Sequence, residues 1–262
     1  MTADERLALL AIKVERAKKH FADLNSAVRV FFDSKPYKIG TKHDPDTRKL
    51  IYYMSAVEPV PPIIGAITGD ILNNLGSALD HLARQLLIVG GTHRPELEFY
   101  FPIRNKASDY KSAIKGIEKT LRQDAIEALR NVEAYKGGNG HNIWVLNRLN
   151  NIDKHRLLVT VSSHLQSVNL GADLWMKANA RWPGIMPKID AYFGQANVLP
   201  LKIGDELFID SPDAKVNKEM DFRFNVALYE PGVVESKPLI ETAQHLCDLV
   251  ANIIALFKPC LG

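Results

Sequence analysis

One stretch of the chain, residues 63–87, has the spacing of a long helix with one apolar and one polar face. Its apolar residues recur every three or four positions: Ile67, Ile71, Leu75, Leu79, Leu82 and Leu86. This spacing places them on one side of a helix with about 3.6 residues per turn. Pro61 and Pro62 precede the stretch and Gly90 and Gly91 follow it, as is typical of a helix start and end. The sequence therefore predicts a central helix around which the other elements are organised.

The same periodicity predicts further helices on both sides of the central one. Thr2 and Glu5 have the spacing of a capping box at the start of the first helix. Cys247 lies on the apolar side of the last helix, where we expect a buried free thiol. The predicted ranges are 3–31, 107–117, 122–132 and 238–257, together with a helix that Asn142 caps and that ends within residues 150–156.

Alternating polar and apolar residues predict strands in two parts of the chain. Residues 36–57 are expected to form a hairpin, and Gly204 with Asp205 a tight turn. Further strands are expected at 157–162, 166–172, 198–203, 206–210 and 220–229. Because helices come from both ends of the chain, we predict a single α+β domain over residues 1–262. It has a helical bundle core, 1–155 and 236–262, and an inserted antiparallel sheet within a β-rich insertion, 156–235.

Composition narrows the classes of protein to which the chain could belong. Apolar residues make up 46% and charged residues 24%, which is typical of a globular protein, and the net charge is only +3. The two cysteines make neither a disulfide framework nor a CxxC metal site. We find no signal peptide, no apolar run expected to span a bilayer and no Walker A or GxGxxG motif, so we expect a cytoplasmic protein without a cofactor or metal.

The polar face of the central helix is the first candidate site. Asp70, Asn74, Ser77 and His81 follow one another along this face, and Arg84 lies near its end. A histidine can transfer a proton near neutral pH, and neighbouring hydroxyl or amide groups can bind a developing charge. We predict His81 and Ser77 as catalytic, and Asn74 and Arg84 as substrate-binding. The alternative is a helix face that satisfies buried polar groups of its neighbours.

A second cluster of ionisable residues lies at a helix-to-strand junction. It consists of Asp153, Lys154, His155 and Arg156. We predict Asp153 and His155 as catalytic and Lys154 and Arg156 as substrate-binding, in a cavity shared with His81. The alternative is a helix C-terminus at which cations offset the dipole.

A long aromatic loop, residues 173–197, is the third candidate element. Such loops are often lids or interface segments, and we predict Trp175 and Trp182 as substrate-binding. The alternative is a loop folded onto the sheet with its aromatic side chains buried.

Four segments together resemble an uncharacterised family of bacterial proteins. They are GDILNNLGSALDHLARQL, the FPI turn, LNRLNNIDKHRLL and the C-terminal helix. The central helix also resembles the HEPN superfamily of helical-bundle proteins, which includes RNases and toxins. Their motif is an arginine followed, after four to six residues, by a histidine near a dimer interface. Here His81 matches the histidine, but Gly76 replaces the arginine that would stabilise phosphate charge.

The resemblance implies a HEPN-like protein that binds or processes RNA as a homodimer, weakened or inactive as a nuclease. The alternative is an enzyme or binding protein for a small molecule, with a pocket at the central helix, the DKHR junction (153–156) and the aromatic loop. A third hypothesis is a non-catalytic partner protein. We expect no membrane partner.

Overall fold

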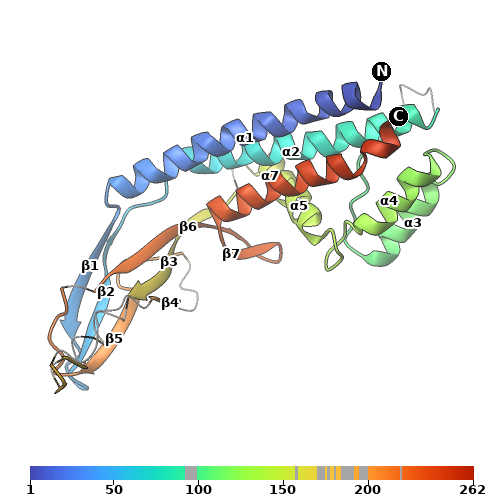
Figure 1. Cartoon of the computed structure of the whole chain (residues 1–262). Helices are drawn as coiled ribbons and strands as arrows, with labels where there is room; N and C mark the ends of the chain where they lie inside the picture. Colours follow the sequence, from blue (N-terminus) through green and yellow to red (C-terminus); the bar gives the residue numbers. More distant parts are fainter. Residues whose placement is uncertain are drawn as a thin grey trace.

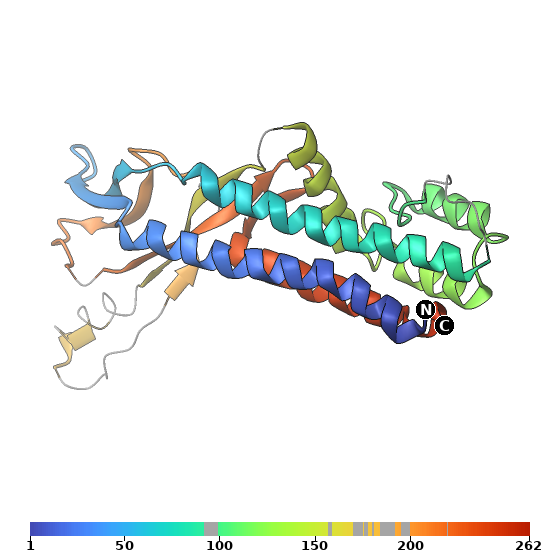
Figure 2. The ribbon, with the colours of Figure 1, turned by 90° about the horizontal axis from the view of Figure 1, so that it is seen from above.

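Three long helices lie side by side and form the largest part of the fold (Figure 1). They are α1 (Ala3–Asp33), α2 (Pro62–Val89) and α7 (Leu239–Leu256). Figure 2 shows the same helices from above, with the strands gathered toward one end of the helical layer. The computed structural model describes residues 1–91, 99–156, 159–169, 175, 178–179, 181–183, 192–194, 200–218 and 220–262. The predicted α+β class, with a helical bundle and antiparallel sheets, is confirmed.

The ends of the long helices form where the sequence predicts them. Pro61 is the N-cap of α2 and Pro62 its first residue. At the other end the Gly90 N–H donates to the Leu86 carbonyl at 3.0 Å, and Gly91 follows with a φ of +82°. The Glu5 N–H donates to Thr2 Oγ1 at 3.2 Å, so the predicted capping box of α1 is confirmed. Local capping signals in the sequence therefore mark where these helices begin and end.

The remaining helices are short and lie at the sides of this layer. They are α3 (Ala107–Ile117), α4 (Gln123–Val132), α5 (His141–His155) and the 3-10 helix η1 (Lys258–Leu261). Asn142 does not cap α5 as predicted, because the helix begins two residues earlier, at His141, and Gly140 is its N-cap. The Asn142 amide instead lies 2.8 Å from Nε2 of His245 on α7.

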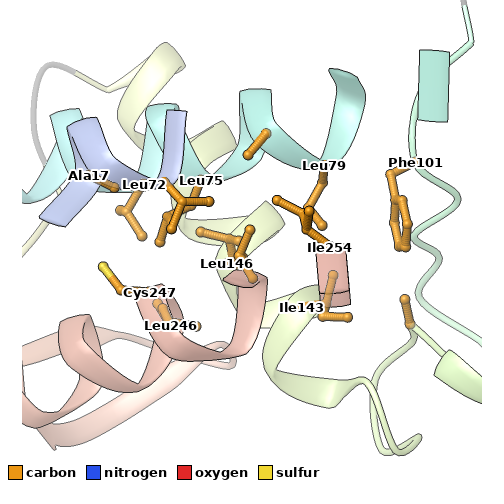
Figure 3. Close-up of a cluster of buried hydrophobic side chains, with 14 of the residues drawn as sticks. Ala17, Leu72, Leu75, Leu79, Phe101, Ile143, Leu146, Leu246, Cys247 and Ile254 are labelled. Carbon is orange, nitrogen blue, oxygen red and sulfur yellow. The ribbon is translucent and has the colours of Figure 1, made fainter. Parts of the chain in front are cut away.

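The main core lies where α1, α2, α5 and α7 meet. Leu72, Leu75 and Leu79 of α2 point toward Leu246 of α7 and Leu146 of α5 (Figure 3). All five side chains are at most 2% exposed, so the apolar stripe of the central helix is the centre of the hydrophobic core.

The cysteine prediction is also confirmed. Cys247 is buried and free in this core, and burial raises the pKa of its thiol to about 11. The thiol is therefore protonated at neutral pH.

The strands form two antiparallel sheets with the orders β1-β2-β5 and β4-β3-β6-β7. Their bounds are β1 (Tyr37–His43), β2 (Lys49–Val57), β3 (Val161–Asn169), β4 (Tyr192–Gly194), β5 (Glu206–Pro212), β6 (Phe222–Glu230) and β7 (Val234–Pro238). The predicted hairpin is β1 with β2. Since β2 also pairs with β5, the β-rich part of the molecule includes this hairpin as well as strands within 156–235.

The β-rich part that follows α5 differs from the sequence prediction in four places. The two strands expected at 157–162 and 166–172 form one described strand, β3, because the polar residues between them are paired on a central strand and Ser163 Oγ accepts from Tyr37 Oη at 2.7 Å. Residues 157–158 and 170–172 lie outside the described residues. The edge strands β4 and β7 were not predicted. Of the strand expected at 198–203, residues 198–199 lie outside the described residues, and 200–203 form no strand because the chain turns at Ile203 and Gly204.

One described helix, α7, is long and apolar enough to cross a membrane by length and composition alone, contrary to the sequence expectation. Core helices of globular proteins meet the same criterion. The buried stripe of α7, which includes Leu246, Cys247 and Val250, packs in the core formed with α1 and α2. This packing accounts for part of its apolar composition, since 33% of the helix is buried.

Candidate functional site

The polar side of α2 crosses α5 at two glycines. A Cβ atom on Gly69 would lie 2.5 Å from either Asp153 carboxylate oxygen, and a Cβ on Gly76 would lie 2.5 Å from Asn150 Nδ2. Both glycines therefore allow polar side chains of α5 to approach the α2 backbone. This close approach is the physical reason for a glycine in the helix interior, where it costs roughly 1 kcal/mol relative to alanine.

A cavity of about 360 Å³ opens beside this crossing, between α2, α5 and the segment 99–104. We call it the α2–α5 cavity. Its walls combine amide, charged and apolar side chains. They are Gly76, Leu79, Asp80, Tyr100, Phe101, Ile103, Arg104, Leu146, Asn147, Asn150, Asn151 and Lys154. The volume lies within the range of small-molecule sites.

Asn150 is the most unusual residue of the α2–α5 cavity. It is 5% exposed, and its Nδ2 lies against the α2 backbone at Gly76. Within the part of the chain that the structure describes, its Oδ1 is buried and accepts no hydrogen bond. A buried polar atom of this kind normally has a partner, so Asn150 is a candidate contact for a ligand toward which its amide could rotate.

Asp80 adds a carboxyl group to the same cavity. Its Oδ1 accepts a hydrogen bond from the Phe101 N–H at 3.3 Å. Burial raises the pKa of Asp80 above its ordinary value, while the Phe101 N–H and the charges of Lys154 and His81 act in the opposite direction. A carboxyl group with a raised pKa in a cavity is typical of functional sites.

The predicted residues of the central helix lie beside the cavity, and none of them lines it. His81 is exposed, while Ser77, Asn74 and Arg84 are half-buried. The Asn74 side chain donates to the Asp70 carbonyl of its own helix at 2.8 Å. The polar residue of α2 that does line the cavity is Asp80, the immediate neighbour of His81.

The four residues of the DKHR junction lie in different environments. Lys154 lines the α2–α5 cavity, whereas His155 is exposed and does not. Asp153 lies against Gly69. Burial raises the pKa of Asp153, a hydrogen bond from the Val159 backbone lowers it, and the Asp70 charge raises it. The structure therefore does not bring His81 and His155 together in this cavity.

Arg156 contacts the sheet. Its Nη1 lies 3.3 Å from Oε2 of Glu230, a residue that is 2% exposed, and Glu230 Oε1 also accepts from the Thr160 N–H at 2.9 Å. This ion pair joins the end of α5 to β6, which is the kind of contact expected from a structural residue.

Most of the predicted aromatic loop, 173–197, lies outside the described residues. Trp175 is half-buried. Trp182 is 51% exposed, and the Arg181 guanidinium lies 5.0 Å from its ring centre. Neither tryptophan is among the described residues that line the α2–α5 cavity.

The residues that the sequence analysis missed are the asparagines of α5. Asn147, Asn150 and Asn151 precede Lys154 by seven, four and three residues, which places all four on one face of a helix. This spacing was visible in the sequence and could have indicated a polar face on α5. Among the described residues, no group of three or more His, Cys, Asp or Glu side chains is arranged to hold a metal ion.

Comparisons of the chain with protein-family models, with curated proteins and with solved structures found no match. Function is therefore inferred from the geometry of the α2–α5 cavity.

Proposed function

We propose that this chain binds a small polar molecule in the α2–α5 cavity. The observation that carries the proposal is Asn150, a residue of the cavity wall whose buried Oδ1 accepts no hydrogen bond from the described residues. Leaving such an atom unpaired costs about 1–3 kcal/mol, and rotation of the amide toward a donor on a ligand would remove that cost.

The other walls of the cavity also favour a ligand. Leu79, Phe101 and Leu146 are buried apolar residues, and Asp80 and Lys154 carry opposite charges. A few convergent polar groups on an otherwise apolar surface are typical of small-molecule sites. Asp80 also gives the cavity a carboxyl group whose pKa is raised by burial, as is common in functional sites.

Blocking the cavity tests the proposal. Asn151 is half-buried in the cavity wall, so Asn151→Trp should fill the space, and Asn131→Trp on the exposed surface of α4 is the matched control. A set of small polar metabolites is screened by ligand-observed NMR against the unmodified protein and both variants. We expect compounds that bind the unmodified protein and Asn131→Trp but not Asn151→Trp. Binding that survives Asn151→Trp would place the site elsewhere.

RNA binding is the second candidate function, and the rim of the cavity favours it. Tyr100 is 60% exposed and lines the cavity with Arg104 and Lys154. An exposed aromatic ring beside cations can stack a base and contact a phosphate. The HEPN-like motif has no cation at Gly76, where a Cβ alone would meet Asn150. We therefore propose weak or absent cleavage of RNA.

RNA binding would appear as an affinity that falls with salt concentration. Gly76→Arg should raise cleavage only if Asn150 moves aside, and a second substitution, His81→Ala, should abolish that gain. Strong cleavage by the unmodified protein that persists in His81→Ala would contradict a HEPN-type mechanism.

We also propose that the protein is cytoplasmic and forms a homodimer. The two cysteines, Cys247 and Cys260, are free and buried, as is common in a reducing compartment. The homodimer is implied by the resemblance to the HEPN superfamily. Light scattering on the purified protein tests it, and a monomeric mass at micromolar concentration would contradict it.

A further inference from the structure

Two opposite charges face the α2–α5 cavity without pairing with each other. Asp80 lies on α2 and Lys154 on α5, and each lines the cavity. Lys154 is near enough for its charge to act on the Asp80 carboxyl group. Yet among the ion pairs of the described residues, which extend to 4.0 Å, neither residue appears. Each of these charges attracts a group of opposite sign, so a molecule in the cavity that carries both charges could contact both residues.

The hydrogen-bonding groups of the cavity divide into acceptors and donors. Asp80 and the Asn150 amide supply acceptors; Asn150 Oδ1 bonds to none of the described residues and meets a ligand when the amide rotates toward the cavity. Lys154 and Arg104 supply cationic donors. Two acceptors suit an ammonium group with its three N–H donors, while the lysine and arginine suit a carboxylate.

Apolar side chains form the rest of the wall. Leu79, Phe101 and Leu146 are each at most 4% exposed, and Ile103 lies beside them. These side chains would cover an aliphatic or aromatic group, whose removal from water is favourable by about 25 cal/mol per Å².

We propose that the α2–α5 cavity binds a zwitterionic α-amino acid with an apolar side chain, its ammonium group on Asp80 and Asn150 and its carboxylate on Lys154 and Arg104. This inference rests on the proposed function, because it names the ligand class of the same cavity. Binding exchanges water for three matched contacts: an ammonium–carboxylate pair, a carboxylate–lysine pair and an apolar contact.

Calorimetry with four probes tests the ligand class. L-leucine and L-phenylalanine carry all three groups, isoamylamine lacks the carboxylate and 4-methylpentanoate lacks the ammonium group. We expect both amino acids to bind, and each leucine analogue to bind at least about tenfold more weakly than leucine, because a charged hydrogen-bonded group is lost.

Charge-removing variants assign each end of the ligand. Asp80→Asn should weaken leucine binding by about tenfold and leave the affinity for 4-methylpentanoate nearly unchanged. Lys154→Gln should weaken leucine but spare isoamylamine. Asp70→Asn on α2 and Lys115→Gln on α3 are exposed and outside the cavity, so neither should alter binding.

The outcomes separate this inference from the proposed function. If neither amino acid binds but another small polar compound binds and is lost in Asn151→Trp, the zwitterion inference is overturned and the cavity remains a ligand site. If the amine or the acid binds as tightly as leucine, the zwitterion inference is also overturned. If no compound responds to Asn151→Trp, both fail.

Discussion

The two sides of α2 are packed by different rules. Toward α1 and α7 the helix presents Leu72 and Leu75, which are at most 2% exposed and surrounded by apolar side chains (Figure 3). At its crossing with α5, beside the apolar contact with Leu146, it presents Gly69 and Gly76, which lie against the polar side chains of Asp153 and Asn150. The first side gains stability from burying apolar surface, whereas the second keeps polar atoms out of water and leaves one acceptor unpaired.

The two sides of α2 therefore have different roles: the apolar side stabilises the fold, and the polar side is the one to which we assign function. Replacing the polar residues of the α2–α5 crossing by apolar residues of the same shape should change the free energy of unfolding little, because such replacements of buried polar pairs are often neutral. A costly polar interface beside a cavity is therefore the part of α2 to which we assign function. Four substitutions test this separation, from the largest expected effect on stability to the smallest.

Leu75→Ala should have the largest effect. Leu75 is fully buried on the apolar side, so the variant loses buried surface and leaves a cavity, at a cost of about 3 kcal/mol in the free energy of unfolding. Urea denaturation measures it. Leu9→Ala on α1 is the matched control, because Leu9 is 52% exposed and should change the free energy by less than about 0.5 kcal/mol. A loss below that limit for Leu75→Ala would contradict the central place of α2 in the core.

Gly76→Ala should destabilise by roughly 1 kcal/mol, although alanine is the better helix former. The new Cβ would meet Asn150 Nδ2 at 2.5 Å, so the asparagine must shift within a buried site. Gly116→Ala in α3 is the matched control, since a Cβ there has no atom within 4 Å and should stabilise the protein. Stabilisation by both substitutions would show that the α2–α5 crossing is not closely packed.

Asp80→Asn should make the protein more stable at neutral pH. The pKa of Asp80 is raised in the folded state, so its ionised form costs stability above that folded pKa, and the cost is absent below the ordinary value of 3.8. The stability gain of the variant should therefore shrink as pH falls through this window. Thermal unfolding across the pH range measures it, and a gain that grows toward acid pH would contradict the burial of this carboxyl group.

Asn150→Leu should have the smallest effect on stability, within about 0.5 kcal/mol of the unmodified protein, because the change also removes the unpaired acceptor. Ligand binding in the α2–α5 cavity should nevertheless be lost. Asn131→Leu on the surface of α4 is the control and should leave both properties unchanged. A loss of several kcal/mol would mean that Asn150 is a structural residue with partners of its own.

Much of the fold follows from local patterns in the sequence. Proline and glycine at the ends of α2, the capping box of α1 and the apolar periodicity of Ile71, Leu75 and Leu79 act within a few residues, so they were predictable. The short edge strand β7 and the continuous strand β3 were not, because their pairing depends on neighbours far along the chain.

The candidate site divides in the same way. The sequence showed the polar face of α2, Lys154 at the end of α5, and Gly76 as a glycine in the interior of a helix. Only the tertiary structure decides that Asp80 rather than His81 lines the cavity, that Arg156 pairs with Glu230, and that Asn150 lies against Gly76 with one acceptor unpaired. Helical periodicity determines which side chains share a face of one helix. The crossing of α2 with α5 determines which side chains of the two helices come into contact. That crossing depends on contacts between residues about 75 positions apart in the chain, which local sequence patterns do not predict.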